Sequence, residues 1–385
     1  MNYEKVCESE EISFYKRFLP YSVTTPTQQL SFDNPQARAN LVFFTDSHVD
    51  FFEKEECLDN VRRTVDFINN APLNYDAVVH TGDIITPFGR HKKSDSLNRT
   101  KAFFDIAKKC RIPFIFSKGN HDLNDWDNTP DEAFTDRDWS DMFLDFAEEK
   151  FGFVRQIKKS GEKSTWHYFD IEEKKIRVVA LDAQDTDKET TREDGCILLH
   201  GGSSWYISNE QMNWLASTAL NFDDKDEKDW GVIFAMHQYM NDSKYHESAM
   251  EKVLLICEAF NEGRAIHIDY ENENPFFNLD VNADFTRYAN LEKKPHMICW
   301  LLGHEHTDNL EIRHGINMIW TLNNSATTVS SDSRIARVHG TPTQNAFDVI
   351  SIDTTHRKIR AFRYGAGVNC YGVGGDRFLP DGIEY

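Results

Sequence analysis

The sequence predicts a layered α/β fold. Short apolar runs rich in Val, Ile and Phe alternate along the chain with longer segments of helical period. The runs at 40–45, 77–80 and 112–117 are almost continuously apolar, which is typical of strands covered on both faces. A chain of 385 residues allows either two domains or one large α/β unit with insertions. Because no segment has the composition of an interdomain linker, we expect residues 1–385 to form a single domain.

The predicted elements alternate in the first third of the chain and come closer together afterwards. A strand at 40–45 precedes a helix near 53–70, a strand at 77–80 precedes a helix near 95–110, and a third strand lies at 112–117. Further strands are predicted at 166–171, 176–181, 231–236 and 297–302. Ser208 and Gln211 form the signature of a capping box, which predicts that a helix starts there. Alternating side chains over 347–364, around a turn at 353–358, predict a C-terminal hairpin within 346–385, followed by a Gly-rich tail.

The composition argues against several classes of protein. A formal net charge of −20 argues against general nucleic-acid binding, nuclease activity and binding to anionic membranes, because all three need an excess of Lys and Arg. The longest apolar runs are far too short to span a bilayer. The seven cysteines are scattered without a C-x-x-C motif, which is typical of reduced thiols. Residues 1–12 lack the basic flank and apolar stretch of a signal peptide, so we expect a cytoplasmic protein.

Five of the predicted strands end in residue types that can bind metals. The first strand ends at Asp46-Ser-His48, the second at Gly-Asp83, the third at Gly-Asn120-His121-Asp122, the fourth at His237 and the fifth at Gly-His304-Glu-His306. In open α/β sheets ligands bind beyond the carboxyl ends of the strands, so these residues should converge. A single Asp or Asn after a strand is most often a turn former or a helix cap, and a lone His most often packs. Five such endings together predict a shared site.

The other histidines provide a comparison for this pattern. Those expected at the surface or in packing positions are His91, His167, His246, His267, His314, His339 and His356. His80 lies just before Gly82 and Asp83, and His200 lies beside two glycines. We assign a metal role to neither of them.

The five motifs, in order from Asp46 to His306, resemble those of the calcineurin-like metallophosphoesterase family. The C-terminal hairpin and the Gly-rich tail are similar to those of bacterial members of its phosphodiesterase-like branch. The resemblance implies a four-layer α/β/β/α sandwich, in which two mixed sheets are flanked by helices and the motif core spans 40–325. It also implies a dinuclear metal centre at the edge of the sheets.

The resemblance further implies how the ligands are divided. Asp46, His48 and His306 would bind one metal, and Asn120, His237 and His304 the other, while Asp83 would bridge the two. Carboxylates and imidazoles without a thiolate suit two divalent transition-metal ions, of which Mn, Fe and Zn are expected. A carboxylate is a suitable bridge for ions held roughly 3.5–4 Å apart. Two such ions would make the site positive within an acidic protein.

The same pattern implies a hydrolytic mechanism, in which a metal-bridging hydroxide attacks phosphorus. His121 is not needed as a ligand because Asn120 occupies that place, so we expect His121 to stabilise or protonate the leaving oxygen. Asp122 either orients the ring of His121 or caps the segment after it. Glu305 should point away from the metals, because side chains alternate along an extended segment. Residues 323–325 either contact substrate or form an Asn-rich turn.

We therefore expect an enzyme that hydrolyses a phosphodiester or phosphomonoester of a small organic molecule or nucleotide. Gly82-Asp83 is followed by Ile-Ile-Thr86 instead of the G-D-x-x-D-R-G pattern of phosphoprotein phosphatases, which argues against a protein phosphatase. Thr86 also stands where an Asp is common, so the sequence leaves open which residue supports Asp83. The alternative function is a catalytically weak scaffold or binding protein on the same fold. The sequence leaves open the native metal, the oligomeric state and whether a diester or a monoester is preferred.

Residues 261–295 interrupt the regular alternation of elements. This insertion is rich in Asn, Asp and Glu and carries several aromatic residues, and it precedes the last metal motif. It forms either an ordered insertion or a flexible lid. Because loops at strand ends carry specificity, we expect it to form part of a wall or lid over the site.

Overall fold

A computed structural model describes residues 38–50, 54–71, 75–87, 89–239, 247–326, 337–367, 376–377 and 382–385. Some predictions concern residues outside these ranges, among them that of His246, which is expected at the surface or in a packing position. Residues 1–12, on which the expectation of no signal peptide depends, lie outside the described residues. So does most of the Gly-rich tail, from 368 to 375.

One mixed sheet, sheet A, places the first three predicted strands side by side. Its order is β15-β14-β13-β1-β2-β3, and β16 pairs with β14. The strands are β1 (Arg38–Phe44), β2 (Ala77–His80), β3 (Phe114–Phe116), β13 (Ala346–Asp353), β14 (Lys358–Gly365), β15 (Asp376–Arg377) and β16 (Ile383–Glu384). The pairs β1–β2 and β2–β3 are parallel, so the carboxyl ends of these three strands lie at one edge. The predicted C-terminal hairpin is confirmed, since β13 and β14 pair antiparallel from Ala346–Gly365 to Asp353–Lys358.

The second mixed sheet, sheet B, contains the strands predicted in the second half of the chain. Its order is β11-β12-β10-β7-β6-β5-β4. The strands are β4 (Val154–Ile157), β5 (Lys163–Ile171), β6 (Ile176–Ala180), β7 (Gly231–Met236), β10 (His296–Leu302), β11 (Asn309–Arg313) and β12 (Ile316–Trp320). Four of them, β6, β7, β10 and β12, run parallel. Their carboxyl ends therefore form a second edge at which polar residues gather.

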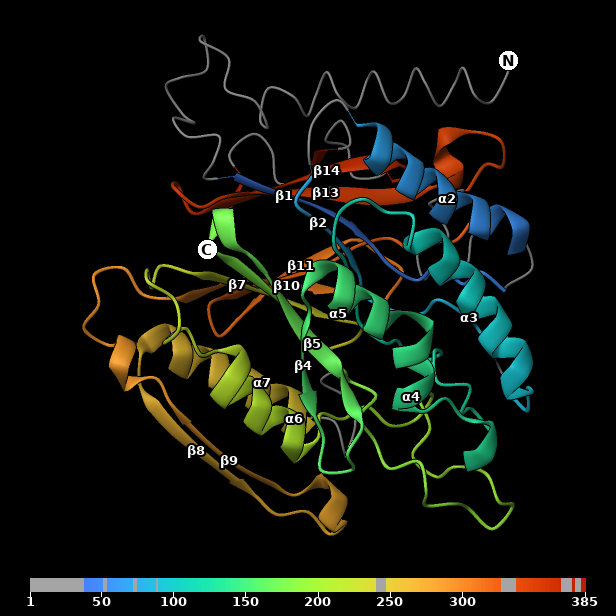
Figure 1. Cartoon of the computed structure of the whole chain (residues 1–385), viewed down its shortest axis with the longest axis horizontal. Coiled ribbons are helices and arrows are strands. Elements are labelled where there is room, and N and C mark those ends of the chain that lie inside the picture. Colours follow the sequence, from blue (N-terminus) through green and yellow to red (C-terminus); the bar gives the residue numbers. More distant parts are fainter. Residues whose placement is uncertain are drawn as a thin grey trace.

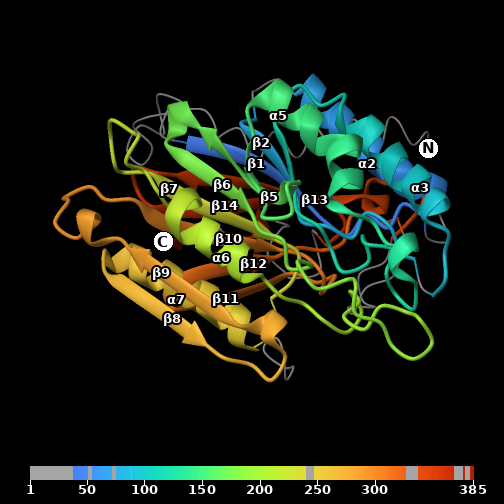
Figure 2. The same cartoon turned by 60° about the horizontal axis from the view of Figure 1, so that its bottom comes forward.

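Helices cover the outer faces of both sheets, which confirms the predicted four-layer arrangement (Figure 1 and Figure 2). The helices on the side of sheet A are α2 (Lys54–Asn70), α3 (Lys93–Ala107), α4 (Asp136–Trp139) and α5 (Asp145–Phe151). Those on the side of sheet B are α6 (Asn209–Trp214) and α7 (Glu247–Glu262). The predicted start of α6 is correct, because the Ser208 hydroxyl accepts from the Gln211 backbone N–H at 3.1 Å.

Two apolar cores lie on the two faces of sheet B. Along β7, Ile233 and Ala235 face the core between the sheets, while Val232, Phe234 and Met236 face the core beneath α6 and α7. All of these side chains are fully buried, which explains why β7 is apolar at every position. The core between the sheets is continuous through sheet A with buried residues of β1, β2 and the covering helix α3, so it joins both halves of the fold.

The insertion at 261–295 forms an antiparallel hairpin of β8 (Ala265–Tyr270) and β9 (Leu279–Asp284). Leu279, Val281 and Ala283 of β9 are buried in the core beneath α6 and α7. Figures 1 and 2 show the hairpin lying against these two helices on the outer side of the molecule. The insertion is thus ordered in the structure, and its role as a wall or lid stays a prediction.

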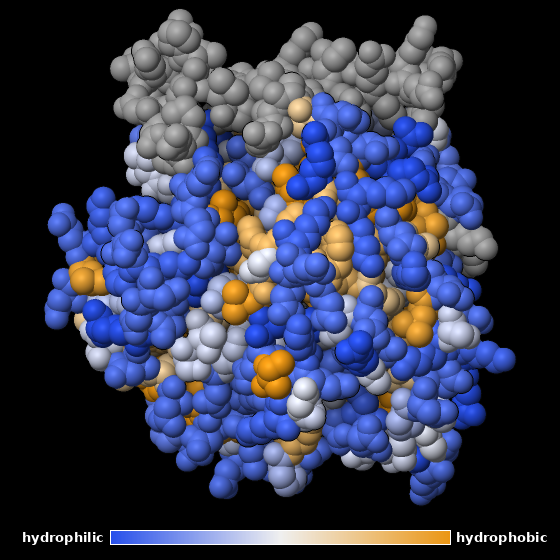
Figure 3. Space-filling model, in the orientation of Figure 1, coloured by the Kyte–Doolittle hydropathy of each residue, from blue (hydrophilic) through white to orange (hydrophobic). Residues whose placement is uncertain are grey.

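The surface agrees with the acidic, polar composition of the chain. Figure 3 shows a face on which hydrophilic residues predominate and interrupt the hydrophobic ones. Within the described ranges, no helix has both the length and the apolar character needed to cross a bilayer. Five cysteines of this part of the chain, Cys57, Cys110, Cys196, Cys257 and Cys299, are buried, and no disulfide joins any two of them.

Candidate metal centre

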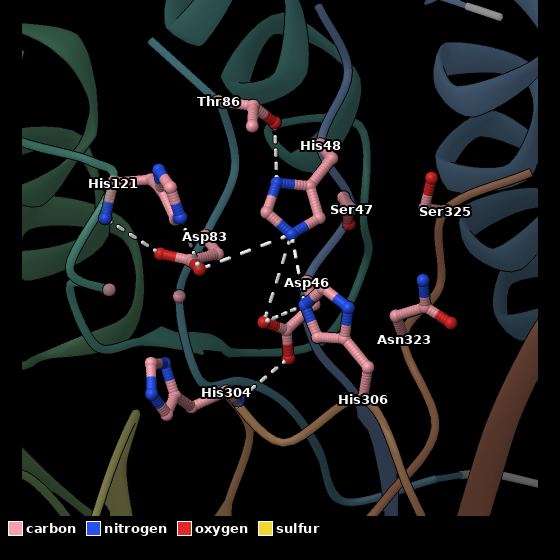
Figure 4. A network of polar contacts seen from close by, with 12 residues as sticks. Asp46, Ser47, His48, Asp83, Thr86, His121, His304, His306, Asn323 and Ser325 are labelled. Carbon is pink, nitrogen blue, oxygen red and sulfur yellow. Dashed lines mark hydrogen bonds and ion pairs between the residues drawn. The ribbon is translucent and has the colours of Figure 1, made fainter. Parts of the chain in front are cut away.

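The structure brings all seven predicted ligands together at the carboxyl ends of β1, β2, β3, β7 and β10. Figure 4 shows Asp46, His48, Asp83, His304 and His306 directed toward one another. The potential ligand atoms form two groups, and the atoms within each group all lie within 4.8 Å of one another. Asp83 belongs to both groups. One group consists of Asp46, His48, Asp83 and His306, and the other of Asp83, His237 and His304. Asn120 joins the second group, since its Oδ1 lies 2.9 Å from His237 Nε2 and 2.9 Å from His304 Nδ1.

The donor atoms converge closely within each group. His306 Nε2 lies 3.1 Å from Asp46 Oδ1 and 3.1 Å from His48 Nε2. Asp83 Oδ2 lies 3.2 Å from His237 Nε2 and 4.0 Å from His48 Nε2, so this carboxylate faces both groups. Oxygen and nitrogen donors without a thiolate suit divalent transition-metal ions. The donor set therefore fits two such ions with Asp83 between them.

Sharp backbone turns direct these side chains toward one point. Asp46, His48, Asp83, His304 and His306 all have positive φ, at 52°, 43°, 55°, 70° and 52°. Few residues other than glycine adopt this region, and such strain is tolerated mainly at functional sites. Backbone hydrogen bonds hold the turns in place, from Asp46 N to Gly82 O at 2.9 Å and from His48 N to Asp83 O at 3.1 Å. Each strand can thus present a ligand as soon as it ends.

Burial and neighbouring charges set the protonation of these side chains. Burial alone raises the pKa of Asp46 and Asp83, but adjacent imidazoles outweigh it and hold both pKa values below the ordinary range. Burial lowers the pKa of His48 to about 3 and the pKa of His304 to about 4. For His237, the Asp83 and Asp46 carboxylates outweigh burial and raise the pKa to about 9. The carboxylates are thus ionised, and His48 and His304 are neutral, in the forms that bind metals.

Comparison with known proteins agrees with this geometry. A family model described as calcineurin-like phosphoesterase matches residues 39–308. This chain belongs to the calcineurin-like phosphoesterase family. The family uses divalent metals, and the two ligand groups of this chain are candidates for binding them. No curated protein sequence matches the chain.

Two solved structures indicate how far the likeness extends. A dimetal phosphatase from Danio rerio has a TM-score of 0.51 at 13% identity, and the match covers 85% of this chain and 96% of that one. An archaeal phosphodiesterase has a TM-score of 0.31 at 9% identity, with 84% and 99% covered. At 13% identity, the likeness to the Danio rerio structure shows only that the two chains share a fold.

Thr86, which stands in place of the Asp common in this family, contacts His48. Its Oγ1 lies 2.5 Å from His48 Nδ1, which leaves His48 Nε2 directed at Asp46, Asp83 and His306. Such a contact fixes both the orientation and the tautomer of a ligating imidazole. The Thr86 backbone N–H in turn donates to Asp50 Oδ1 at 2.6 Å.

Thr86→Val is expected to weaken metal binding without unfolding the protein. The substitution keeps the shape of the side chain but removes the contact to His48 Nδ1. Loss of a contact of this kind typically costs about 10–100-fold in metal affinity. Calorimetric titration with Mn²⁺ would measure the change. Thr100→Val is a matched control, because Thr100 is buried in α3 and donates to the Ser96 carbonyl instead. Equal affinities in the two variants would contradict this role.

Asp122 lies beneath the turn that carries Asp83. Its carboxylate accepts from the backbone N–H groups of Asp83 at 2.8 Å, Ile84 at 2.7 Å and Gly119 at 2.7 Å. Burial and the neighbouring Asp83 carboxylate raise the pKa of Asp122 to about 7. These contacts tie the turns after β2 and β3 to each other. The predicted role of Asp122 in orienting the ring of His121 stays a prediction.

The predicted catalytic His121 lies next to Asp83, as Figure 4 shows. Its backbone N–H donates to Asp83 Oδ1 at 2.9 Å, and its Nε2 lies 4.0 Å from Asp83 Oδ2. The side chain is 12% exposed, so the ring lies at the border between the site and solvent. A position beside the shared carboxylate, and outside both ligand groups, is compatible with a role toward the leaving group.

Two glycines of the site have no alternative residue. A Cβ added at Gly119 would lie 2.1 Å from Asp83 Oδ1, and one added at Gly303 would lie 2.7 Å from Asp46 Oδ2. Both contacts are far shorter than any van der Waals distance. The sequence signal for them is a glycine directly before a ligand motif, and that signal by itself does not distinguish a close approach from an ordinary turn.

Two further groups of residues brace the site: residues 323–325, for which the sequence left open a substrate contact or an Asn-rich turn, and the surroundings of Arg363, which the sequence did not reveal. Residues 323–325 are buried, and the Asn324 and Ser325 backbone N–H groups donate to the carbonyls of Thr45 and Asp46 at 2.7 and 3.2 Å. Arg363 of β14 contacts Asp348 Oδ1 at 2.7 Å and Asp308 Oδ1 at 2.6 Å. This buried ion cluster links sheet A to the segment that follows His306.

His80 and His200 lie in packing positions. The Gly82 backbone N–H donates to His80 Nδ1 at 3.2 Å, and His80 Nε2 lies 3.0 Å from the Ser47 hydroxyl. His80 therefore supports the turns that carry Asp46 and Asp83. His200 lies beside Trp126, a residue that sequence reasoning also missed.

Proposed function

We propose that this chain is a binuclear metal-dependent phosphoesterase that hydrolyses a phosphodiester or phosphomonoester of a small organic molecule or nucleotide. The observation that carries the proposal is the sharing of Asp83 between two groups of converging donor atoms. One carboxylate facing two sites is the arrangement expected for ions held roughly 3.5–4 Å apart. Membership of the calcineurin-like phosphoesterase family supports the reaction class.

Seven residues of the chain would bind the two ions. Asp46, His48 and His306 would hold one ion, Asn120, His237 and His304 the other, and Asp83 both. Bound divalent ions supply a water of lowered pKa as nucleophile and neutralise the phosphoryl oxygens. The left-handed turns after β1, β2 and β10 hold these donors in place before substrate binds, so little reorganisation is needed.

His121 would act on the leaving group. Asn120 already takes the ligand position of this motif, and the ring of His121 lies at the border of the site. A proton held on this imidazole would be delivered to the departing oxygen, which typically contributes roughly 10²–10⁴-fold to the rate. The net charge of −20 supports a small substrate over a nucleic acid.

The alternative is a scaffold or binding protein that has lost turnover on the same fold. The complete set of ligand residues disfavours it, because a scaffold does not need them. Elemental analysis after Mn²⁺ loading is expected to find about two ions per chain. Fewer than about one ion per chain, together with absent turnover, would favour the scaffold.

A substrate comparison tests the activity directly. Nitrophenyl phosphate and bis-nitrophenyl phosphate distinguish a monoesterase from a diesterase, and a panel of phosphorylated metabolites then narrows the substrate. We expect turnover of at least one of the two esters by the Mn²⁺-loaded full chain and none after chelation. Turnover that chelators do not abolish would overturn the proposal.

A further inference from the structure

One indole touches both residues of the Asn120-His121 motif. The ring of Trp126 stacks on the ring of His121, with centroids 4.3 Å apart and an interplanar angle of 26°. Its Nε1 also donates to the backbone carbonyl of Asn120 at 2.9 Å. An indole in this position restricts rotation of the imidazole from one face.

The position of Trp126 is not explained by core packing. Its side chain is half-buried, and it belongs to none of the apolar cores formed by the described residues. An aromatic side chain of this size usually contributes to stability through the area that it buries in a core. The contacts of Trp126 include His121, Asn120 and the loop described next.

A long loop, the clamp loop (185–206), holds the turn that carries Trp126. The Gly201 backbone N–H donates to both oxygens of the buried Asp125 carboxylate, at 3.1 and 3.0 Å. Lys188 Nζ reaches the same carboxylate at 2.7 Å, with the Asp125 side chain 0% exposed. The Ile197 backbone N–H donates to the Asn128 carbonyl at 2.8 Å. The clamp loop is thus attached on both sides of Trp126.

Two glycines of the clamp loop leave room for the indole. A Cβ added at Gly202 would lie 2.7 Å from Trp126 Cε2 and 2.9 Å from Cδ2. A Cβ added at Gly201 would lie 2.0 Å from the Asn120 carbonyl oxygen, which is the acceptor of the indole N–H. The His200-Gly201-Gly202 sequence therefore packs directly against Trp126 and Asn120. A larger residue at 202 would push the indole away from its place beneath His121.

We propose that Trp126 is a positioning residue for His121, and that the clamp loop holds it there through Gly201, Gly202 and Asp125. The proposal rests on the proposed function, in which His121 acts on the leaving group. The indole fixes the imidazole in the rotamer that faces Asp83. Without it, the ring samples other rotamers and donates its proton less often, while the metal ligands keep their places.

The test compares four variants of the full chain. Trp126→Leu removes the stacking, and Trp126→Phe keeps an aromatic ring but loses the N–H donor. Gly202→Ala displaces the indole while Trp126 itself is unchanged. Gly195→Asn is the matched control, because it lies in the same loop, has nothing within 4 Å of an added Cβ, and has a φ of +80° that Asn tolerates.

The first readout is independent of activity. In Zn²⁺-loaded, ¹⁵N-histidine-labelled protein, the stacked indole shields the ring protons of His121 by its ring current. We expect the His121 resonances to move downfield in Trp126→Leu and in Gly202→Ala. In Gly195→Asn we expect the His121 resonances at their wild-type positions. In Trp126→Phe we expect them closer to the wild-type positions than in Trp126→Leu. Unchanged His121 resonances in Trp126→Leu and Gly202→Ala would overturn the proposal.

The second readout is the dependence on the leaving group, measured with Mn²⁺-loaded enzyme on nitrophenyl and phenyl esters. For Trp126→Leu we expect kcat on the phenyl ester to fall about 10-fold or more, within the roughly 10²–10⁴-fold contribution of a general acid. KM and metal content should stay unchanged. The kcat on the nitrophenyl ester should fall by a smaller factor, and Trp126→Phe should keep most of the wild-type rate. Equal losses for the two esters would overturn the proposal.

Failure of the proposed function gives a different pattern. If wild-type protein binds two ions and turns over no ester, the proposed function fails, while the His121 resonances still decide whether Trp126 positions the ring. If Trp126→Leu does not fold, Gly202→Ala decides both readouts.

Discussion

Asp83→Ala is expected to lose metal and activity together. Its Oδ2 faces His237 at 3.2 Å and His48 at 4.0 Å, so the substitution removes a ligand from both groups at once. The loss leaves His237 buried without its nearest carboxylate, and Asp83 Oδ1 no longer accepts from the His121 backbone N–H. Removing a single stabilising donor from a phosphoryl or acyl transfer site typically costs about 10²–10³-fold in kcat. Removing the shared ligand should therefore cost more than about 10³-fold.

Two measurements on the same preparation test this result. Elemental analysis gives the metal content, and turnover of the better nitrophenyl ester gives the activity. Asp83→Asn separates charge from shape, since it keeps the size of the side chain and loses the negative charge. Asp141→Ala is a control for removal of a carboxylate, because Asp141 is 55% exposed and pairs with Arg137 on the surface. Full metal content and full activity in Asp83→Ala would exclude Asp83 as the bridge.

His121→Ala is expected to keep both metals and to slow turnover selectively. The ring lies outside both ligand groups, and in the proposed site Asn120 would supply the ligand of this motif. Loss of a general acid typically costs roughly 10²–10⁴-fold, and the cost should be largest for a poor leaving group such as an alkoxide. Nitrophenolate departs with little help from an acid, so the turnover of its ester should fall by a smaller factor.

The series of leaving groups is the measurement that decides the role of His121. His267→Ala is the control, because His267 lies on β8, is 56% exposed and pairs with Asp280. It should behave as the wild type with every ester. If His121→Ala slows good and poor leaving groups equally at full metal content, His121 positions the phosphate and is not the acid.

Much of the fold could be predicted because its determinants are local. The strands β2 and β7 begin and end at the predicted residues, since each is a continuous apolar run that ends in Gly-Asp or His. The strand β3 is shorter than predicted, at Phe114–Phe116 instead of 112–117. Pro113 has no N–H to donate to the ladder, so the strand begins after it. The helix α3 ends at Ala107 and not near 110, because Lys109 and Cys110 continue it only as turns, with backbone N–H groups that donate to the carbonyls three residues earlier.

The fold class, the order of the ligand motifs and the sheet edge at which they meet follow from local sequence patterns. Apolar runs of strand length are visible residue by residue, and parallel strands place their carboxyl ends together. The contact between Thr86 and His48, the contacts of Asp122 to two turns and the position of Trp126 against His121 are visible only in the folded chain. The same holds for the contact from Arg363 to the segment after His306, at a distance of 55 residues along the chain. These contacts join segments far apart in sequence, and side chains that pair across sheets carry no local pattern that reveals the partner.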